Sequence, residues 1–279
     1  GTRWSSIAGA LNDLSSGSTR KQPCNKQGVP RMRQHLLAFV QAATEALQLE
    51  GPVYEFGVSS LNRQGCGDGF RDCFSEASYV GCDLSQDARA NRINDLARLP
   101  IPDAAAKTVI CIDTLQYVAD PIRVAQEMTR ILAPGGTLVF GSSIDPDEPD
   151  PPGRFWRPTL DMINVIMSGL EATLIGWQGP QRRAHTLFGI GAKSPVTGKF
   201  APLANLFLRD FQRRLNQLAS EARRRRIMRA LLAFCPFGTR GKRTPSNYYR
   251  SNFVLHLPVG RQFKHDLLSS YLPGEQPGH

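Results

Sequence analysis

The chain of 279 residues is long enough for one large α/β domain with an appendage. Hydrophobic residues make up 41% of it and no run of about 18 apolar residues occurs, so we expect a packed core and no transmembrane helix. The net charge of +10 arises after residue 193, where 15 basic and 4 acidic residues stand, against 19 basic and 20 acidic ones before it. This asymmetry favours a phosphate-rich partner for the C-terminal third.

The cysteines and the N-terminal residues indicate the compartment. The six cysteines form no C-x-x-C pair and have no histidine at zinc-finger spacing, so we expect reduced thiols, no metal site and a cytoplasmic protein. Residues 1–29 are polar and lack the apolar core of a signal peptide, which predicts a flexible N-terminal arm.

The predicted elements begin with a helical repeat of apolar residues that opens at Pro30 and ends at Gly51-Pro52. Short apolar runs then alternate with helical patterns. The expected strands are 53–57, 78–83, 107–113, 137–142, 172–177 and 186–191, and the expected helices between them are 121–132 and 159–170. Strands separated by helices predict an α/β fold with a doubly wound, mostly parallel, Rossmann-like sheet over residues 30–193.

Residues 194–279 are expected to form a basic helical C-terminal extension. Apolar positions over Phe207–Phe234 predict one long helix or two consecutive ones, and Asn252–Leu257 is a short strand candidate.

Acidic residues stand at the ends of successive predicted strands. Glu55 lies near the end of the first strand, Asp83 ends the second, and Asp95 precedes Leu99-Pro100. A carboxylate at the end of the second strand can accept both hydroxyls of a ribose, and ligands of such sheets bind at the carboxyl ends of the strands. Gly57 lets the backbone approach a ligand closely. Together these residues predict a nucleoside site.

Four segments in order, YEFG, YVGCDLS, INDLARLPIPDAAAKTVICIDTLQYVADP and RILAPGGTLVFG, resemble the class I S-adenosylmethionine-dependent methyltransferases, in particular methyltransferase type 11. The resemblance covers about residues 51–191 and implies an enzyme that takes S-adenosylmethionine as its cofactor. It also implies cofactor contacts, with Glu55 and Gly57 at the methionine end, Asp83 on the ribose, and Leu84, Asp95 and Leu96 against the adenine. Ile112, Asp113 and Thr114 would form the floor of the site, with Gln116 and Tyr117 beside it.

Two departures from the family pattern keep a second hypothesis open. Val58-Ser59-Ser60 follows Gly57 where the family has further glycines, and Gln116-Tyr117 stands where relatives often carry Glu-His. A cofactor without phosphate needs fewer glycines, but it must still fit past Val58 or Ser59. The alternative is a non-catalytic binding protein that keeps the fold.

Methyl transfer depends on holding nucleophile, methyl group and sulfur in line, and a hydroxyl acceptor also needs a base. The candidate catalytic residues are His185, Asp113 and Asp145, all expected near strand ends. Each has a structural alternative: a loop-orienting contact for His185, a helix N-cap for Asp113 and a solvated acidic loop for Asp145. Phe155 and Trp156 are candidates for the roof of an acceptor pocket or for the core.

The resemblance favours a small-molecule, glycan or lipid-precursor acceptor. An RNA methyltransferase is the alternative, with contacts from the run Arg223–Arg226 and from Arg213, Arg214 and Arg229. The apolar positions of the same segment make peripheral attachment to a membrane surface equally plausible, and a solvated helix face is the structural alternative. The oligomeric state has no signal in the sequence.

Overall fold

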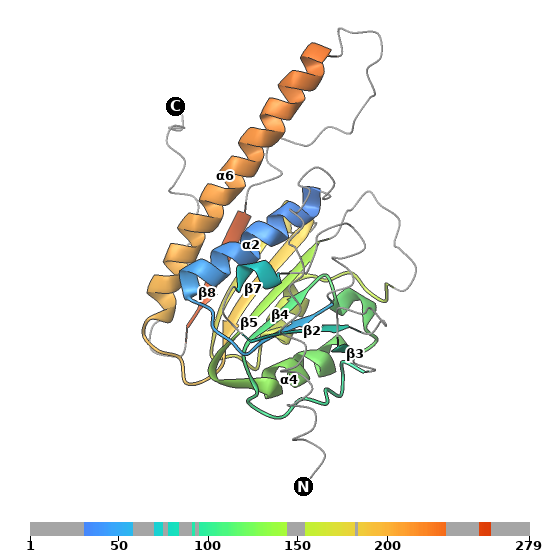
Figure 1. Cartoon of the computed structure of the whole chain (residues 1–279), viewed down its shortest axis with the longest axis vertical. Coiled ribbons are helices and arrows are strands. Elements are labelled where there is room, and N and C mark those ends of the chain that lie inside the picture. Colours follow the sequence, from blue (N-terminus) through green and yellow to red (C-terminus); the bar gives the residue numbers. More distant parts are fainter. Residues whose placement is uncertain are drawn as a thin grey trace, which may run out of the picture.

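A computed structural model describes residues 31–57, 70–74, 78–83, 91–92, 95–143, 154–181, 184–232 and 251–257. Within these ranges eight strands form one sheet in the order β3-β2-β1-β4-β5-β7-β6-β8 (Figure 1). The strands are β1 (Val53–Phe56), β2 (Tyr79–Asp83), β3 (Asn91–Arg92), β4 (Ala106–Ile112), β5 (Leu132–Ser143), β6 (Ala172–Gln178), β7 (Thr186–Ala192) and β8 (Ser251–His256). The helices are α2 (Arg31–Leu47), α4 (Pro121–Ile131), α5 (Leu160–Ile166) and α6 (Phe200–Leu232), with short 3-10 turns η2 (Arg71–Cys73) and η3 (Leu115–Tyr117).

The sheet is mixed. Strands β3, β2, β1, β4 and β5 pair in parallel, β7 lies antiparallel between β5 and β6, and β8 pairs antiparallel with β6. The chain builds outward from β1 to β3 and then returns to the other side of β1 as β4, which creates a switch in strand order at β1 and β4. The expected α/β fold with a doubly wound, mostly parallel sheet is confirmed.

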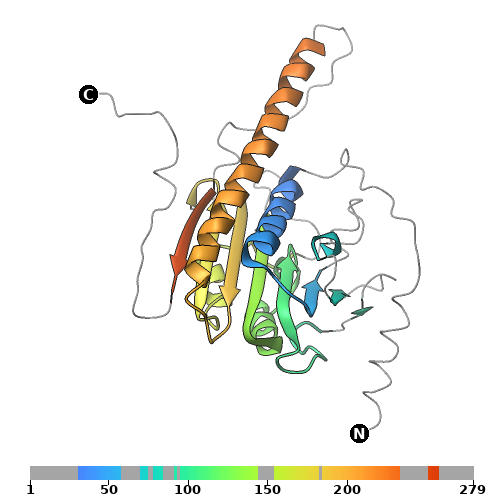
Figure 2. The same ribbon diagram turned by 60° about the vertical axis from the view of Figure 1, so that its left-hand side comes forward.

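Helices cover both faces of the sheet. Helices α2 and α6 lie side by side on one face (Figure 2), and the aromatic rings of Phe39, Phe188, Phe207, Phe211 and Phe253 meet there. Helices α4 and α5 pack their buried side chains into a second cluster with residues of β4 and β5. None of the helices that the structure describes is long and apolar enough to cross a bilayer.

The C-terminal segment contributes to this core. Phe207 and Phe211 of α6 and Phe253 of β8 are buried in the same cluster as Phe39 of α2. The predicted strand over Asn252–Leu257 is confirmed as β8, and the predicted helix is a single one that begins at Phe200. The division of the chain after residue 193 stays a prediction, but the hydrophobic core is continuous across it.

Helix α6 is longer than the strands of the sheet. Its 33 residues span about 50 Å at about 1.5 Å each, whereas the seven residues of β7 span about 23 Å. It begins beside the end of β7, so it runs toward the carboxyl ends of the parallel strands and projects beyond them (Figure 1). The last fully buried side chain described on it is Leu215.

One predicted helix end was wrong, and one predicted helix stop lies in a strand. Helix α4 begins as expected, with Pro121 in its first turn and the Asp120 carboxylate accepting from Arg123 N–H at 2.9 Å, but it passes directly into β5 at Leu132. The run 133–136, expected as a helix stop, therefore lies in a strand. Helix α5 ends at Ile166, followed by a turn.

Candidate active site

The carboxyl ends of β1, β2 and β4 lie next to one another. Phe56 of β1 is in register with Cys82 of β2 on one side and Cys111 of β4 on the other. Asp83 and Asp113 follow those two cysteines by one and two residues, so both stand at the same edge as Gly57. The sequence-based placement of these strand-end residues at one edge is confirmed.

Gly57 allows β1 and β4 to approach closely at this edge. Its φ is +91°, and a Cβ atom at this position would overlap Thr114 Oγ1. The Thr114 hydroxyl lies 2.8 Å from the carbonyl oxygen of Phe56 and 2.9 Å from that of Ile112, and it donates to this pair. Residues 58–69 lie outside the described residues, so the fit of a cofactor past Val58 and Ser59 stays a prediction.

Glu55 is buried beneath the edge, with 1% of its surface exposed. Its Oε2 accepts a short hydrogen bond from the Tyr79 hydroxyl and a longer one, 3.4 Å, from Phe70 N–H. Burial raises the pKa of Glu55 to about 7, although the Tyr79 hydrogen bond and the Arg71 charge oppose this, and nearby Asp83 adds to it. Its Oε1 has no hydrogen-bond partner among the described residues.

The two acids assigned to the nucleoside differ in exposure. Asp83 is 9% exposed at the end of β2, close enough to Glu55 for the two charges to interact. Asp95 is exposed, and its Oδ1 accepts from Ala97 N–H at 2.8 Å, which closes a turn beside the buried Leu96. Leu84 lies outside the described residues.

Two serines at the end of β5 bind Asp113, expected at the floor of the site, and Gln116, expected beside it. Ser143 donates to the Asp113 carboxylate from its backbone N–H, at 2.6 Å, and from its hydroxyl, at 2.9 Å. Ser142 donates to Gln116 Oε1 at 2.8 Å. Thr114, not Asp113, is the N-cap residue of η3, so the helix-cap alternative for Asp113 was wrong. Its backbone instead adopts a positive φ of 51° as it leaves β4.

His185 stands at the same edge, at the start of β7. Its backbone N–H donates to the Gln178 carbonyl oxygen at 2.9 Å, and its Nδ1 lies 3.0 Å from Thr186 Oγ1. Thr186 is paired with Ser143 across β7 and β5. The structure therefore places His185 and Asp113 at the same edge of the sheet, at the start of β7 and the end of β4, with β5 between them. Asp145 lies outside the described residues.

A buried polar chain lies behind His185. His35 of α2 donates from Nδ1 to Gln178 Oε1 at 2.8 Å, and Gln178 Nε2 donates to Ser251 Oγ of β8 at 2.9 Å. Burial, together with the smaller effect of nearby His185, lowers the pKa of His35 to about 4, although the hydrogen bond with Gln178 opposes this. This chain connects α2, β6 and β8 at the carboxyl edge.

Sequence reasoning missed the residues that support the candidates. The supporting residues are Tyr79, Ser142, Ser143 and His35. The serines at the end of a buried strand were a usable signal, because buried hydroxyls need partners. The partner of Tyr79 depends on which strands pair, which no local pattern reveals.

Comparison with known proteins agrees with this arrangement. Residues 63–140 match the model of the methyltransferase type 11 family, which is described as a methyltransferase domain. No curated protein matches the chain.

Solved structures with a similar fold include several methyltransferases. A possible histamine N-methyltransferase from Thermotoga maritima has 17% identity and a TM-score of 0.41, covering 58% of this chain and 93% of that one. An S-adenosylmethionine-dependent methyltransferase from Mesorhizobium loti has 20% identity and a TM-score of 0.40, covering 55% of this chain and 98% of that one. The N-methyltransferase NodS from Bradyrhizobium japonicum, in complex with S-adenosylhomocysteine, has 15% identity and a TM-score of 0.44, covering 67% and 97%.

The matched segment contains β2 and β4 with their strand-end acids, helix α4 and most of β5. The chain therefore contains a methyltransferase domain of type 11, matched over residues 63–140.

Proposed function

We propose that this domain transfers the methyl group of S-adenosylmethionine to a small-molecule, glycan or lipid-precursor acceptor at the carboxyl edge of β1, β2, β4 and β5. The observation that carries the proposal is the meeting of Gly57, Asp83 and Asp113 at the switch in strand order, where sheets of this kind bind their ligands.

The residues at this edge fit the cofactor. Asp83 would hold the ribose hydroxyls, and Asp95 with Leu96 would face the adenine. Glu55 presents a buried oxygen without a hydrogen-bond partner among the described residues, which suits the ammonium group at the methionine end. When bound, S-adenosylmethionine supplies a methyl group activated by the sulfonium; the remaining task of the protein is to orient the acceptor and remove its proton.

His185 is the candidate base. Its Nδ1 contacts the Thr186 hydroxyl, so its Nε2 is the atom assigned to the acceptor proton. Asp113 is less suited to that task, because both of its carboxylate oxygens accept hydrogen bonds from Ser143. We assign Asp113 to the floor of the site.

Phe155 marks the side of the site assigned to the acceptor. Its backbone N–H donates to the Gln116 carbonyl oxygen at 2.9 Å, yet 65% of the residue is exposed. The neighbouring Trp156 instead packs against the core, with its indole N–H on the Val118 carbonyl oxygen at 3.1 Å. An exposed aromatic ring beside the candidate floor suits stacking on a sugar or a planar acceptor.

Calorimetric titration with S-adenosylhomocysteine tests the proposal. Asp83→Asn should weaken binding by roughly 10- to 100-fold, because hydrogen bonds to a charged group are lost. Asp161→Asn, which changes an exposed acid of α5, is the matched control and should bind as the wild type does. Absence of binding to the wild-type protein at millimolar ligand would contradict the proposal.

An anionic partner for α6 remains part of the proposal. Arg213 and Arg214 form ion pairs with Asp210, and Arg214 also pairs with Glu45, so these two arginines serve the fold. Arg223 and Arg224 are exposed and have no such partner among the described residues. Binding of the full chain to anionic vesicles and to RNA, each at low and high salt, distinguishes the two classes of partner. Binding to neither would leave α6 as a solvated helix.

A further inference from the structure

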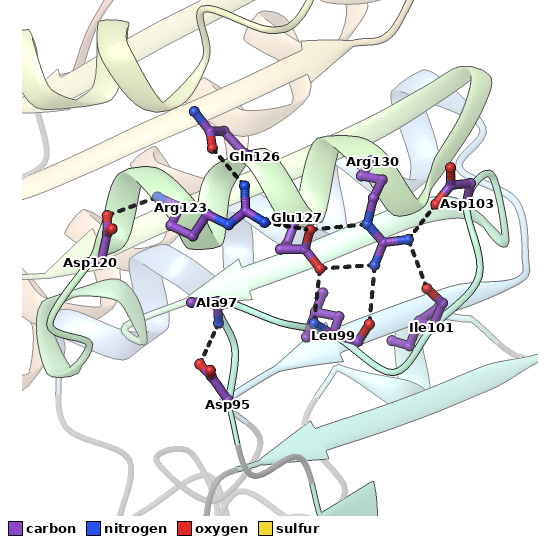
Figure 3. A network of polar contacts seen from close by, with 10 residues as sticks. All are labelled: Asp95, Ala97, Leu99, Ile101, Asp103, Asp120, Arg123, Gln126, Glu127 and Arg130. Carbon is purple, nitrogen blue, oxygen red and sulfur yellow. Dashed lines mark hydrogen bonds and ion pairs between the residues drawn. The ribbon is translucent and has the colours of Figure 1, made fainter.

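A pair of side chains on α4 holds residues 95–103 in place. The Leu99 N–H donates to Glu127 Oε2 at 2.9 Å (Figure 3). Arg130 donates to the carbonyl oxygens of Leu99, at 3.1 Å, and Ile101, at 2.9 Å. Three backbone groups of an irregular segment are thus bound by two side chains of one helix.

The Glu127 and Arg130 side chains also bind each other, and Arg130 binds Asp103. Arg130 donates to Glu127 from Nε at 3.0 Å and from Nη2 at 2.9 Å, and its Nη1 donates to Asp103 at 2.5 Å. Glu127 is 6% exposed, and the hydrogen bonds from Arg130 are the largest cause of its lowered pKa. Both groups are therefore ionised at neutral pH, and every nitrogen of the Arg130 guanidinium has a partner within the protein.

The held segment has few bonds of its own. The described backbone bonds of residues 95–104 are Arg98 N–H to the Asp95 carbonyl oxygen and Ala104 N–H to the Arg130 carbonyl oxygen, both 3.3 Å. Leu96 and Leu99 provide buried apolar contacts. With no strand ladder here, the order of this segment depends on α4, because fixing an irregular backbone costs conformational entropy.

We propose that Glu127 and Arg130 are positioning residues for adenine recognition. They fix Leu99, and through it the turn in which Asp95 and Leu96 face the base. This inference rests on the proposed function, which assigns the adenine to that turn. A small displacement of the turn would weaken contacts to the base while leaving the ribose contacts of Asp83 in place.

The experiment compares S-adenosylhomocysteine with its inosine analogue, which carries hypoxanthine in place of adenine. Calorimetry on the wild-type chain should show a preference for the adenine ligand. Arg130→Lys keeps the charge but cannot reproduce the forked geometry. It should lower affinity for S-adenosylhomocysteine roughly tenfold and bring the two ligands toward equal affinity, because charged hydrogen bonds that place the turn are lost.

Arg98→Lys is the matched control. Arg98 belongs to the same segment, is exposed, and makes no side-chain hydrogen bond among the described residues. It should keep the wild-type preference. Glu127→Gln keeps an acceptor for Leu99 N–H and removes the charge, so it should reduce the preference less than Arg130→Lys does. It also replaces Arg130→Lys in the comparison if that variant does not fold.

The outcomes separate the inference from the proposed function. If the variants unfold at lower temperature but keep the wild-type preference between the two ligands, the pair is only structural and the inference is wrong. If the wild-type chain binds neither ligand, the proposed function fails and the inference fails with it.

Discussion

The carboxylate of Asp113 accepts two hydrogen bonds from Ser143, one from the backbone and one from the hydroxyl. Since Asp113 follows β4 and Ser143 ends β5, this contact joins two parallel strands at the edge assigned to the cofactor. The same serine is in register with Thr186, whose hydroxyl contacts His185. The geometry of the candidate base and of the floor is thus coupled through one residue.

Ser143→Ala should destabilise the protein by about 1–2 kcal/mol, because a hydrogen bond to a buried carboxylate is lost while the backbone N–H remains. Chemical unfolding in urea measures this. Ser168→Ala removes an exposed hydroxyl that donates to a backbone carbonyl in the turn after α5 and is the control, with an expected change below about 0.5 kcal/mol. An equal loss of stability in both variants would contradict the role of Ser143.

Gly57→Ala should destabilise the edge for two separable reasons. The positive φ costs about 1–2 kcal/mol for a residue with a Cβ, and the Cβ also overlaps the Thr114 hydroxyl. Adding Thr114→Ala should relieve the overlap but not the backbone cost. A double-mutant cycle measured by urea unfolding would therefore show favourable coupling between the two substitutions. Strict additivity would mean that the overlap is relieved by movement elsewhere.

Because of Glu55, the free energy of unfolding should fall as the pH rises from about 4.5 to about 7. Its pKa is raised in the folded state from 4.5 to about 7, so in this window the folded protein binds the proton that the unfolded chain has lost. The resulting loss is on the order of 3 kcal/mol at pH 8 relative to pH 4.

Glu55→Gln isolates this contribution. The variant should lack this part of the pH dependence and exceed the wild type in stability at pH 8, as measured by urea unfolding at both pH values. Glu171→Gln on the amino-end side of β6 is a control that should follow the wild-type profile. Parallel profiles for the wild type and Glu55→Gln would show that folding does not shift the pKa of Glu55.

Phe211→Ala should cost about 3–5 kcal/mol, because the ring is buried among aromatic side chains of α2, β7 and β8. Leu206→Ala on the exposed side of α6 is the control and should change stability by less than about 1 kcal/mol. A small effect at Phe211 would mean that α6 is not part of the cooperative core. The measurement thereby tests the division of the chain after residue 193.

The predicted strands are found because each is a short apolar run with clear ends. Apart from the exposed Lys107, the run of residues 107–113 is buried on both faces, as its apolar sequence indicates, and Asp83 lies at the end of β2 as expected. The helix end near residue 132 was predicted to within one residue, but the run Ala133-Pro134-Gly135-Gly136 already belongs to β5. Gly135 and Gly136 exchange backbone hydrogen bonds with Lys193, a contact distant in sequence.

By itself the sequence determined the fold class, the order of the strand-end acids and the resemblance to methyltransferases, since these depend on periodicity and on short motifs within the chain. Only the tertiary structure decided that Ser143 binds Asp113, that Tyr79 binds Glu55 and that α6 shares a core with α2. Those contacts join residues distant in sequence, and their geometry depends on strand pairing and on the packing of helices over the sheet, which local propensity does not encode.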